Sequence, residues 1–354
     1  MTGVDTSPGW NSDANVSTTS VLAGSRETPS LGITTKASQA AHSNRFDVRA
    51  STDFKVTEHF GFTETPNAQE NMVTKKHVLE VAERYEEVDG RFPLTGIAVV
   101  YRSSGILFHT ILRSVNKPPP NEFQQLAPTL PNQGTLIPPD AYAPFFPADG
   151  SISRAPNPLP EDIFIKRPTL IHFDRYLDQG SPNAVAEALL SEARVSEILR
   201  RHPHPNIAEY HGCEVSRDGR TTGLCWTRLG GSLMQRVNPR FIGKGIFKYR
   251  PGSLYNKDDL LDKIKAGIEH IHRIGLVHND INPSNIMFDK NDNPLIIDFG
   301  SCTPIGYSLE HVGRTYQWFD ENVRISTPRN DLDGLEEIRE WLREGGSKQF
   351  QFAA

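Results

Sequence analysis

The chain has 354 residues, enough for two ordinary domains or for one large domain with tails. Its 38 basic and 43 acidic residues give a formal net charge of −5, which offers no electrostatic basis for binding nucleic acid or an anionic membrane. Three widely spaced cysteines form no Cys-x-x-Cys pair, so neither a disulfide framework nor a zinc site is indicated. The longest apolar runs are far short of the ~20 residues that cross a bilayer. We therefore expect an intracellular protein, cytoplasmic or nuclear, without nucleic-acid or membrane partners.

Three segments have the composition of tails or linkers. Residues 1–58 are rich in Ser, Thr, Asn and Asp with isolated apolar residues, and predict a disordered tail. Residues 117–145 are rich in proline, which prevents a continuous helix or central strand and predicts an extended linker with short ordered pieces. Residues 346–354 are expected to form a short C-terminal tail.

Residues 59–116 predict a small accessory segment, a helix followed by a hairpin. Within residues 67–87, four apolar residues follow a helical spacing: Met72, Val78, Val81 and Ala82. The following stretch "TGIAVVYRSSGILFHTIL" predicts two strands around a Ser-Ser-Gly turn.

Residues 146–345 alternate strand and helix signals. Short apolar runs predict strands at "DIFIKRP" and "TTGLCWTRL". Apolar residues at helical spacing predict two helices, "AVAEALLSEARVSEILRRH" and "NKDDLLDKIKAGIEHIHRIG". The second has a polar first turn and ends at Gly275, which are common start and stop signals.

The stretch "VHNDINPSNIMFDKNDNPLIIDFGS", residues 277–301, places carboxylates and amides among apolar residues. Buried charge is costly unless it is paired or binds a cation, and a turn at "DKNDN" explains only part of the pattern. Phosphoryl transfer from a nucleotide needs oxygen ligands for Mg²⁺ and a carboxylate near the attacking hydroxyl, and this stretch can supply both. The residues that form the pattern are His278, Asp280, Asn285, Asp298, Phe299 and Gly300.

This arrangement resembles the catalytic loop and the metal-binding loop of the protein kinase superfamily, H-R-D-x-x-x-x-N followed by D-F-G. The resemblance implies that Asp280 accepts or orients the proton of the substrate hydroxyl, and that Asn285 and Asp298 hold Mg²⁺ for ATP. His278, Phe299 and Gly300 would support the site structurally.

The flanking sequence extends the resemblance to about residues 145–345. Lys166 lies where a strand lysine reaches the nucleotide phosphates, and Glu192 lies on the following helix, able to pair with it. "CWTRLGG" resembles the hinge, with Cys225 as its gatekeeper, and Asp331 resembles the aspartate that braces the catalytic loop. The resemblance is strongest to short protein-kinase-like proteins of filamentous fungi. It implies an α+β, two-lobed fold with a small β-rich lobe and a truncated helical lobe.

The sequence departs from the kinase pattern at four points. No G-x-G-x-x-G precedes Lys166; the stretch there, "GSISRAPNPLPED", contains one glycine and three prolines. Asn279 replaces the arginine that pairs with a phosphorylated activation segment in many kinases. Asn282 replaces a lysine that neutralises the transferred phosphate. Few residues follow Asp331, which suggests a shortened large lobe.

Three functions are compatible with these residues. The first is a slow ATP-dependent protein kinase of Ser/Thr type, which uses the retained Lys166, Glu192, Asp280, Asn285 and Asp298 on a protein substrate. The second is a pseudokinase, a kinase-shaped module that binds a partner without turnover. The third is a small-molecule kinase of the aminoglycoside or choline phosphotransferase type. The likeness of "HPNI", "LGGSL" and "VGRTYQWFDEN" to protein kinases favours the first over the third.

Overall fold

The computed structural model describes residues 76–344, apart from residues 87, 90, 92, 114, 115, 253 and 255. The predicted tails at 1–58 and 346–354 lie outside the described residues. All described residues belong to a single compact unit.

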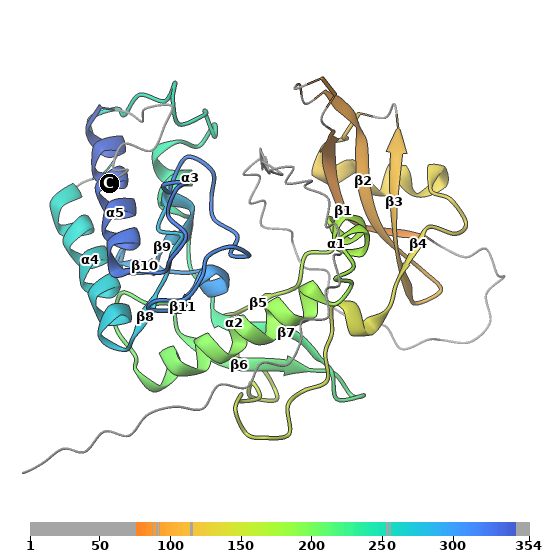
Figure 1. The fold of residues 1–354 in the computed structure, drawn as a ribbon, viewed down its shortest axis with the longest axis horizontal. Helices are drawn as coiled ribbons and strands as arrows, with labels where there is room; N and C mark the ends of the chain where they lie inside the picture. Colours follow the sequence, from red (N-terminus) through yellow and green to blue (C-terminus); the bar gives the residue numbers. More distant parts are fainter. Residues whose placement is uncertain are drawn as a thin grey trace, which may run out of the picture. The chain divides into compact units, whose positions relative to one another are not determined.

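A four-stranded antiparallel sheet opens the described part of the chain (Figure 1). Its strands follow the chain order: β1 (His77–Tyr85), β2 (Leu94–Ser103), β3 (Ile106–Arg113) and β4 (Thr135–Ile137). We call it the front sheet. The predicted hairpin is confirmed as β2 and β3, which are joined by Ser104 at φ 50° and Gly105 at φ 80°. This positive φ explains the glycine at the turn.

The helix predicted within residues 67–87 is wrong where the structure describes it, because His77–Tyr85 form strand β1. The register between β1 and β2 shifts between Val78 and Glu80. A bulge of this kind lets two residues three apart face the same side of a sheet. Val78 and Val81 both enter the apolar cluster on one face of the front sheet, so their spacing imitates a helix.

The proline-rich stretch 117–145 contains the short ordered pieces that the sequence predicts, and they are part of the front sheet's structure. It forms the 3-10 helix η1 (Pro120–Thr129), strand β4 and the short 3-10 helix η2 (Pro139–Ala141). Both helices have proline in their first turn, where its missing N–H costs no hydrogen bond. Leu126 and Leu130 are buried against the same face as Val78 and Val81.

A second, three-stranded sheet has the order β5-β7-β6 and is followed through the chain by a mostly helical part. All the strands and helices predicted between residues 162 and 275 are confirmed. The elements are β5 (Ile163–Lys166), α1 (Phe173–Asp178), α2 (Ala184–Arg201), β6 (Tyr210–Val215), β7 (Thr221–Thr227), α3 (Leu233–Val237), α4 (Lys257–Arg273) and α5 (Pro328–Glu344).

Short strands and 3-10 turns carry the polar stretch 277–301. Strand β8 (Leu276–Val277) pairs with β11 (Thr303–Pro304), and β9 (Ile286–Phe288) pairs with β10 (Pro294–Ile296). The turns η3 (Pro283–Asn285) and η4 (Phe299–Ser301) lie beside these strands in the chain. The polar residues therefore lie at strand ends and turns, where backbone groups can bond to side chains.

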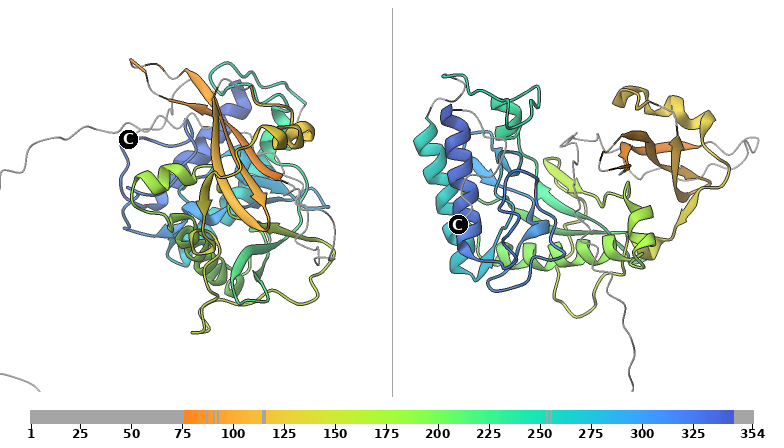
Figure 2. Two further views of the ribbon diagram at one scale, coloured as in Figure 1. Left: turned by 90° about the vertical axis from the view of Figure 1, so that its right-hand side faces the viewer. Right: turned by 45° about the horizontal axis from the view of Figure 1, so that its top comes forward.

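One apolar core joins the second sheet to the helices. Helices α4 and α5 run side by side (Figure 2), and Ile264 and Ile268 of α4 share a buried cluster with Leu335 and Ile338 of α5. Helix α4 begins as predicted, because the Asn256 side chain accepts a hydrogen bond from the Asp259 backbone N–H. The architecture is a mixed α+β fold, as the sequence predicts. No helix within the described residues combines the length and apolar character needed to span a bilayer.

Candidate active site

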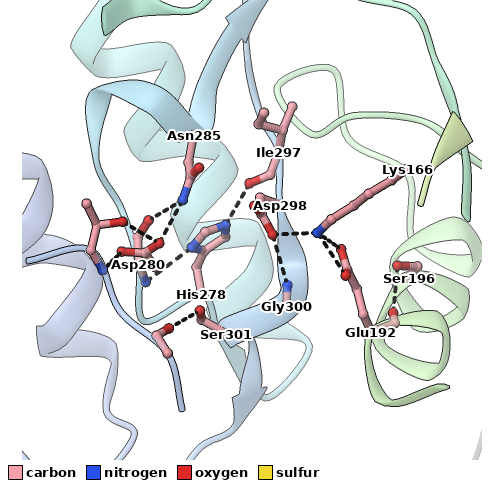
Figure 3. Close-up of polar contacts among 12 residues, drawn as sticks. Lys166, Glu192, Ser196, His278, Asp280, Asn285, Ile297, Asp298, Gly300 and Ser301 are labelled. Carbon is pink, nitrogen blue, oxygen red and sulfur yellow. Dashed lines mark hydrogen bonds and ion pairs between the residues drawn. The ribbon is translucent and has the colours of Figure 1, made fainter. Parts of the chain in front are cut away.

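Three charged side chains from distant parts of the chain meet in one cluster (Figure 3). Lys166 is the last residue of β5, and its Nζ lies 2.7 and 2.8 Å from the two carboxylate oxygens of Glu192 on α2. The same Nζ lies 2.7 Å from Oδ1 of Asp298, which follows β10. Asp298 has φ 62° and accepts the Gly300 N–H on Oδ1 at 3.4 Å. The structure thus brings together three residues that the sequence analysis assigned to one site.

The electrostatics of this cluster favour a charged lysine. Burial acts to lower the pKa of Lys166, but the adjacent carboxylates of Asp298 and Glu192 outweigh it and raise that pKa. Burial likewise acts to raise the pKa of Asp298, and the charge of Lys166 outweighs it and lowers the pKa. The pKa of Glu192, which is 7% exposed, is raised chiefly by burial. The Lys166 side chain is 32% exposed, so the cluster lies at the edge of the solvent-accessible surface.

Asp280 is surrounded by donors that hold its carboxylate in place. Oδ1 accepts the Thr315 backbone N–H at 2.8 Å, and Oδ2 accepts the Thr315 hydroxyl at 2.9 Å. Asn285 Nδ2 donates to the same Oδ2 at 3.0 Å and to the Asp280 carbonyl at 2.9 Å. Asn282 Nδ2 donates to the Thr315 hydroxyl oxygen at 3.0 Å. The carboxylate therefore already holds a hydroxyl group, from its own chain.

The pKa of Asp280 is raised from its ordinary value to about 6. Burial is the largest cause, and the hydrogen bonds from Thr315 oppose it. A carboxyl group with a pKa near 6 is ionised at neutral pH and is a better proton acceptor than an ordinary aspartate.

Asp331, in the first turn of α5, fixes the backbone that carries Asp280. Its side chain is fully buried and accepts the backbone N–H groups of His278 at 2.8 Å and Asn279 at 2.7 Å. His272 Nε2 lies 2.8 Å from the same carboxylate. The predicted brace is therefore present in the geometry.

His278 and Phe299 form the contact between the two motif loops. His278 Nε2 bonds the Ile297 carbonyl at 2.9 Å, and its Nδ1 accepts the Asp280 N–H at 3.3 Å. The Phe299 ring is fully buried, lies edge-on to the His278 ring at 5.4 Å and stacks on Trp226 at 5.6 Å. The positions of Asp280 and Asp298 are thus coupled through packed rings.

The protein kinase domain family model matches residues 178–321 of this chain. Over this range the chain is similar to the protein kinase domain family. The matched range includes Glu192, Asp280, Asn285 and Asp298, whereas Lys166 and Asp331 lie outside it.

Curated relatives are protein kinases of larger size. The chain is 29% identical over 147 residues to the MAP kinase kinase kinase win1 of Schizosaccharomyces pombe, which covers 37% of the chain and 9% of the relative. It is 37% identical over 129 residues to the serine/threonine-protein kinase SKS1 of Saccharomyces cerevisiae, covering 35% of the chain and 24% of the relative. It is 29% identical over 133 residues to the MAP kinase kinase kinase SSK2 of the same yeast, covering 36% and 7%. The chain therefore spans at most about a quarter of each of these relatives.

Within this kinase-like site, Asn279 has a structural role that comparison with the kinase motif does not predict. It adopts φ 63°, a left-handed conformation that asparagine tolerates better than most residues. Its Nδ2 donates to the carbonyls of Val277 at 3.0 Å and Ser301 at 3.2 Å, and its Oδ1 accepts from Asn330 at 3.0 Å. An asparagine here ties the catalytic loop to its neighbours instead of presenting a cation.

Cys225 is not part of the cluster. Cys225 is paired with Ile165 in the antiparallel register of β7 and β5, whereas Lys166 is paired with Leu224. Residues opposite each other in a sheet share a face and successive residues alternate, so Cys225 lies on the face away from Lys166. The side chain that reaches the site from β7 is that of Trp226, through its contact with Phe299. The gatekeeper assignment to Cys225 is therefore not supported by the strand register.

Sequence reasoning also missed Thr315. Thr315 lies in the stretch "VGRTYQWFDEN", which resembles protein kinases in sequence, and its hydroxyl group is the available signal. The contact between Thr315 and Asp280 depends on how the segment folds back across the loop, so residue spacing alone does not predict it.

The donor set at Asn285 and Asp298 fits Mg²⁺. Within residues 76–344, neither Oδ1 of Asn285 nor Oδ2 of Asp298 has a hydrogen-bond partner, although the remaining polar atoms of both side chains do. Mg²⁺ prefers oxygen ligands and binds through one or two protein groups plus substrate phosphates and water. In the described part of the chain no group of three or more His, Cys, Asp or Glu side chains is arranged to hold a metal on its own. Such a Mg²⁺ site would therefore need the nucleotide phosphates as further ligands.

Proposed function

We propose that the chain is a slow ATP-dependent protein kinase of Ser/Thr type. The observation that carries the proposal is the contact of Asp280 Oδ2 with a threonine hydroxyl at 2.9 Å, in a chain whose Lys166 is paired with both Glu192 and Asp298. One carboxylate is thus positioned to receive a hydroxyl proton, and one ammonium is positioned for phosphate oxygens. The similarity to serine/threonine kinases supports this choice of substrate class.

Each residue has a definite part in this function. Mg-ATP supplies the transferable γ-phosphoryl group when it is bound. Lys166 would bind phosphate oxygens, and Glu192 would keep the ammonium in place. Asn285 and Asp298 would hold Mg²⁺, while Asp280 takes the proton from the attacking serine or threonine hydroxyl. For a protein substrate to react, the Thr315 hydroxyl must first leave Asp280 Oδ2 or share it.

The proposed rate is low because of two features of the chain. Asn282 is uncharged, so no cation stands there to stabilise the transferred phosphoryl group, and electrostatic stabilisation carries most of this catalysis. The stretch before Lys166 has no glycine-rich loop. The backbone of this stretch is instead hydrogen-bonded to strand β6. Cys213 N–H donates to the Ser153 carbonyl and Ala155 N–H donates to the Cys213 carbonyl, each at 2.8 Å.

The bonds that join Ser153 and Ala155 to Cys213 also favour a second candidate, a kinase-shaped binding module without turnover. Ser153 also bonds α2, with its hydroxyl 3.1 Å from a carboxylate oxygen of Glu197. A segment tied to β6 and α2 is less free to fold over a nucleotide. A module of this kind would present the kinase fold to a partner protein.

Nucleotide binding separates the two candidates. Adding Mg-ATP at about 100 times its Kd is expected to stabilise the native protein by about 2.7 kcal/mol, because only the native state binds it. We expect the melting temperature to rise by several degrees in the parent and to stay constant in Asp298→Ala, which lacks a magnesium ligand. Differential scanning fluorimetry with Mg-ATP, ATP alone and Mg²⁺ alone measures this. No Mg-ATP shift in the parent would leave the binding module as the better description.

The pKa of Asp280 predicts the pH dependence of the reaction. Because that pKa is raised to about 6, the carboxyl is mostly protonated at pH 5 and mostly ionised at pH 7. A protonated carboxyl cannot take the hydroxyl proton, so the rate of phosphate transfer should rise with pH and reach half its plateau near pH 6. The measurement is the initial rate at saturating Mg-ATP between pH 5 and 8. A rate that is constant across this range would show that Asp280 is not the proton acceptor.

A further inference from the structure

The front sheet has two covered faces, and each is covered by a different part of the chain. One face carries its own apolar cluster with η1, which includes Val78, Val81 and Leu126. The other face is covered by the segment that connects β5 to α2. Leu170, Ile171 and Phe173 of this segment are buried in one cluster with residues of the sheet: Ala98, Val100, Leu107 and Ile137.

The covering segment is the piece of chain between the two partners of the Lys166–Glu192 pair. Lys166 ends β5, and Glu192 lies 26 residues further along on α2. Val185, in the first turn of α2, packs against the same cluster as Leu170 and Ile171. Val185 precedes Glu192 by two helical turns, about 10 Å along a rigid helix. The place where α2 begins on the front sheet therefore affects where Glu192 lies.

Polar contacts fix the segment on the sheet at defined points. The Glu80 carboxylate on β1 accepts the N–H of Leu170 at 3.0 and 3.1 Å and that of Ile171 at 3.1 Å. Arg84, four residues along β1, forms an ion pair with Asp174 of α1. These bonds fix the position of the segment on the sheet more precisely than apolar packing alone. Any shift would leave a donor without its acceptor, which costs free energy.

His109 of β3 adds a third polar contact. This buried residue has Nε2 3.1 Å from the Ile171 carbonyl and 3.5 Å from Asp174. The segment is thus hydrogen-bonded to two strands of the front sheet.

We propose that the front sheet positions α2 and so holds Glu192 against Lys166. The importance of that ion pair for nucleotide binding rests on the proposed function.

Matched variants of two glutamates on β1 test this. Glu80→Ala removes the acceptor of two backbone N–H groups, whereas Glu80→Gln keeps one acceptor oxygen. Glu83→Ala is the control, because Glu83 is exposed and accepts a bond from Tyr85 of its own strand. The double variant Glu80→Ala/Arg84→Ala removes two of the polar contacts together.

The readouts require no nucleotide. One is the rate at which an amine-acylating reagent labels Lys166, measured by mass spectrometry, and the other is hydrogen exchange of the α2 amides. In Glu80→Ala/Arg84→Ala we expect labelling and α2 exchange to increase by about tenfold, with α5 exchange unchanged as the internal reference. Glu80→Gln should restore most of the parent behaviour, and Glu83→Ala should match the parent.

A purely structural role gives a different result. If the front sheet only stabilises itself, its own amides will exchange faster in the double variant while Lys166 labelling and α2 exchange stay at the parent values. That outcome would overturn the proposal. Should the double variant fail to fold, Glu80→Ala alone carries the same comparison against Glu83→Ala. The kinase function is tested separately by the binding of Mg-ATP to the parent. If the parent binds no Mg-ATP but the double variant still shows faster labelling of Lys166, the positioning role is upheld and the kinase function is refuted.

Discussion

Replacing Asp331 with alanine is expected to lower the free energy of unfolding by about 3–5 kcal/mol. The carboxylate is fully buried and accepts two backbone N–H groups, from His278 at 2.8 Å and from Asn279 at 2.7 Å. Its loss leaves both donors, and the His272 ring nitrogen at 2.8 Å, without their acceptor in the buried interior. Urea unfolding followed by circular dichroism measures the change from the shift of the midpoint.

Glu336 on the same helix provides the control. Its carboxylate pairs with Arg339 at 3.1 Å and its side chain is 44% exposed, so Glu336→Ala should cost no more than about 1 kcal/mol. Asp331→Asn should fall between the two alanine variants, because its amide oxygen still accepts one or two of the N–H groups. If Asp331→Ala and Glu336→Ala destabilise the protein equally, Asp331 does not hold the loop backbone in place.

The sequence predicted the polar cluster well because kinase-like chemistry requires fixed residue types at fixed spacing. Asp280, Asn285 and Asp298 lie in one short stretch, so their contacts depend on local turns and on two short strand pairs. Lys166 and Glu192 are far apart in the chain, and only the order of strand and helix linked them. The structure brings their charged groups to 2.7 Å. The role of each residue in a reaction remains a prediction.

The front sheet was harder to predict because its signals depend on tertiary pairing. A bulge between Val78 and Glu80 gives β1 an apolar spacing of three, which in sequence is indistinguishable from a helix. Strand β4 has only three residues and follows a proline-rich stretch, so its pairing with β3 leaves almost no local signal. Long-range pairing of this kind overrides local propensity.

Errors within the site have a similar origin. The face on which Cys225 lies depends on the register of β7 against β5, and one residue of register reverses it. The sequence analysis treated Asn279 only as the loss of an arginine, because comparison with a motif gives the function of the usual residue and not that of its replacement. The structure shows what asparagine does at φ 63°, which is to bond the Val277 and Ser301 carbonyls.

Replacing Asp280 with asparagine is expected to reduce the rate of phosphate transfer by about 10²–10⁴-fold if the chain is a kinase. The asparagine Oδ1 can still accept the Thr315 N–H that the Asp280 carboxylate accepts at 2.8 Å, so the loop should keep its shape. An amide cannot take a hydroxyl proton, so the chemical step loses its proton acceptor. Transfer of labelled phosphate from Mg-ATP to a mixture of protein substrates, at saturating nucleotide, measures the loss.

The thermal shift with Mg-ATP should survive in Asp280→Asn, because Lys166 and Asp298 do not contact the changed side chain and Asn285 keeps its bond to the carbonyl of residue 280. Asp292→Asn is the matched control, since Asp292 lies in the turn between β9 and β10 with a side chain that is 72% exposed. Its transfer rate should equal that of the parent. A variant that keeps nucleotide binding but loses transfer assigns Asp280 to the chemical step. Equal transfer by Asp280→Asn and the parent would mean that the phosphate transfer comes from another protein in the preparation or uses another acceptor group.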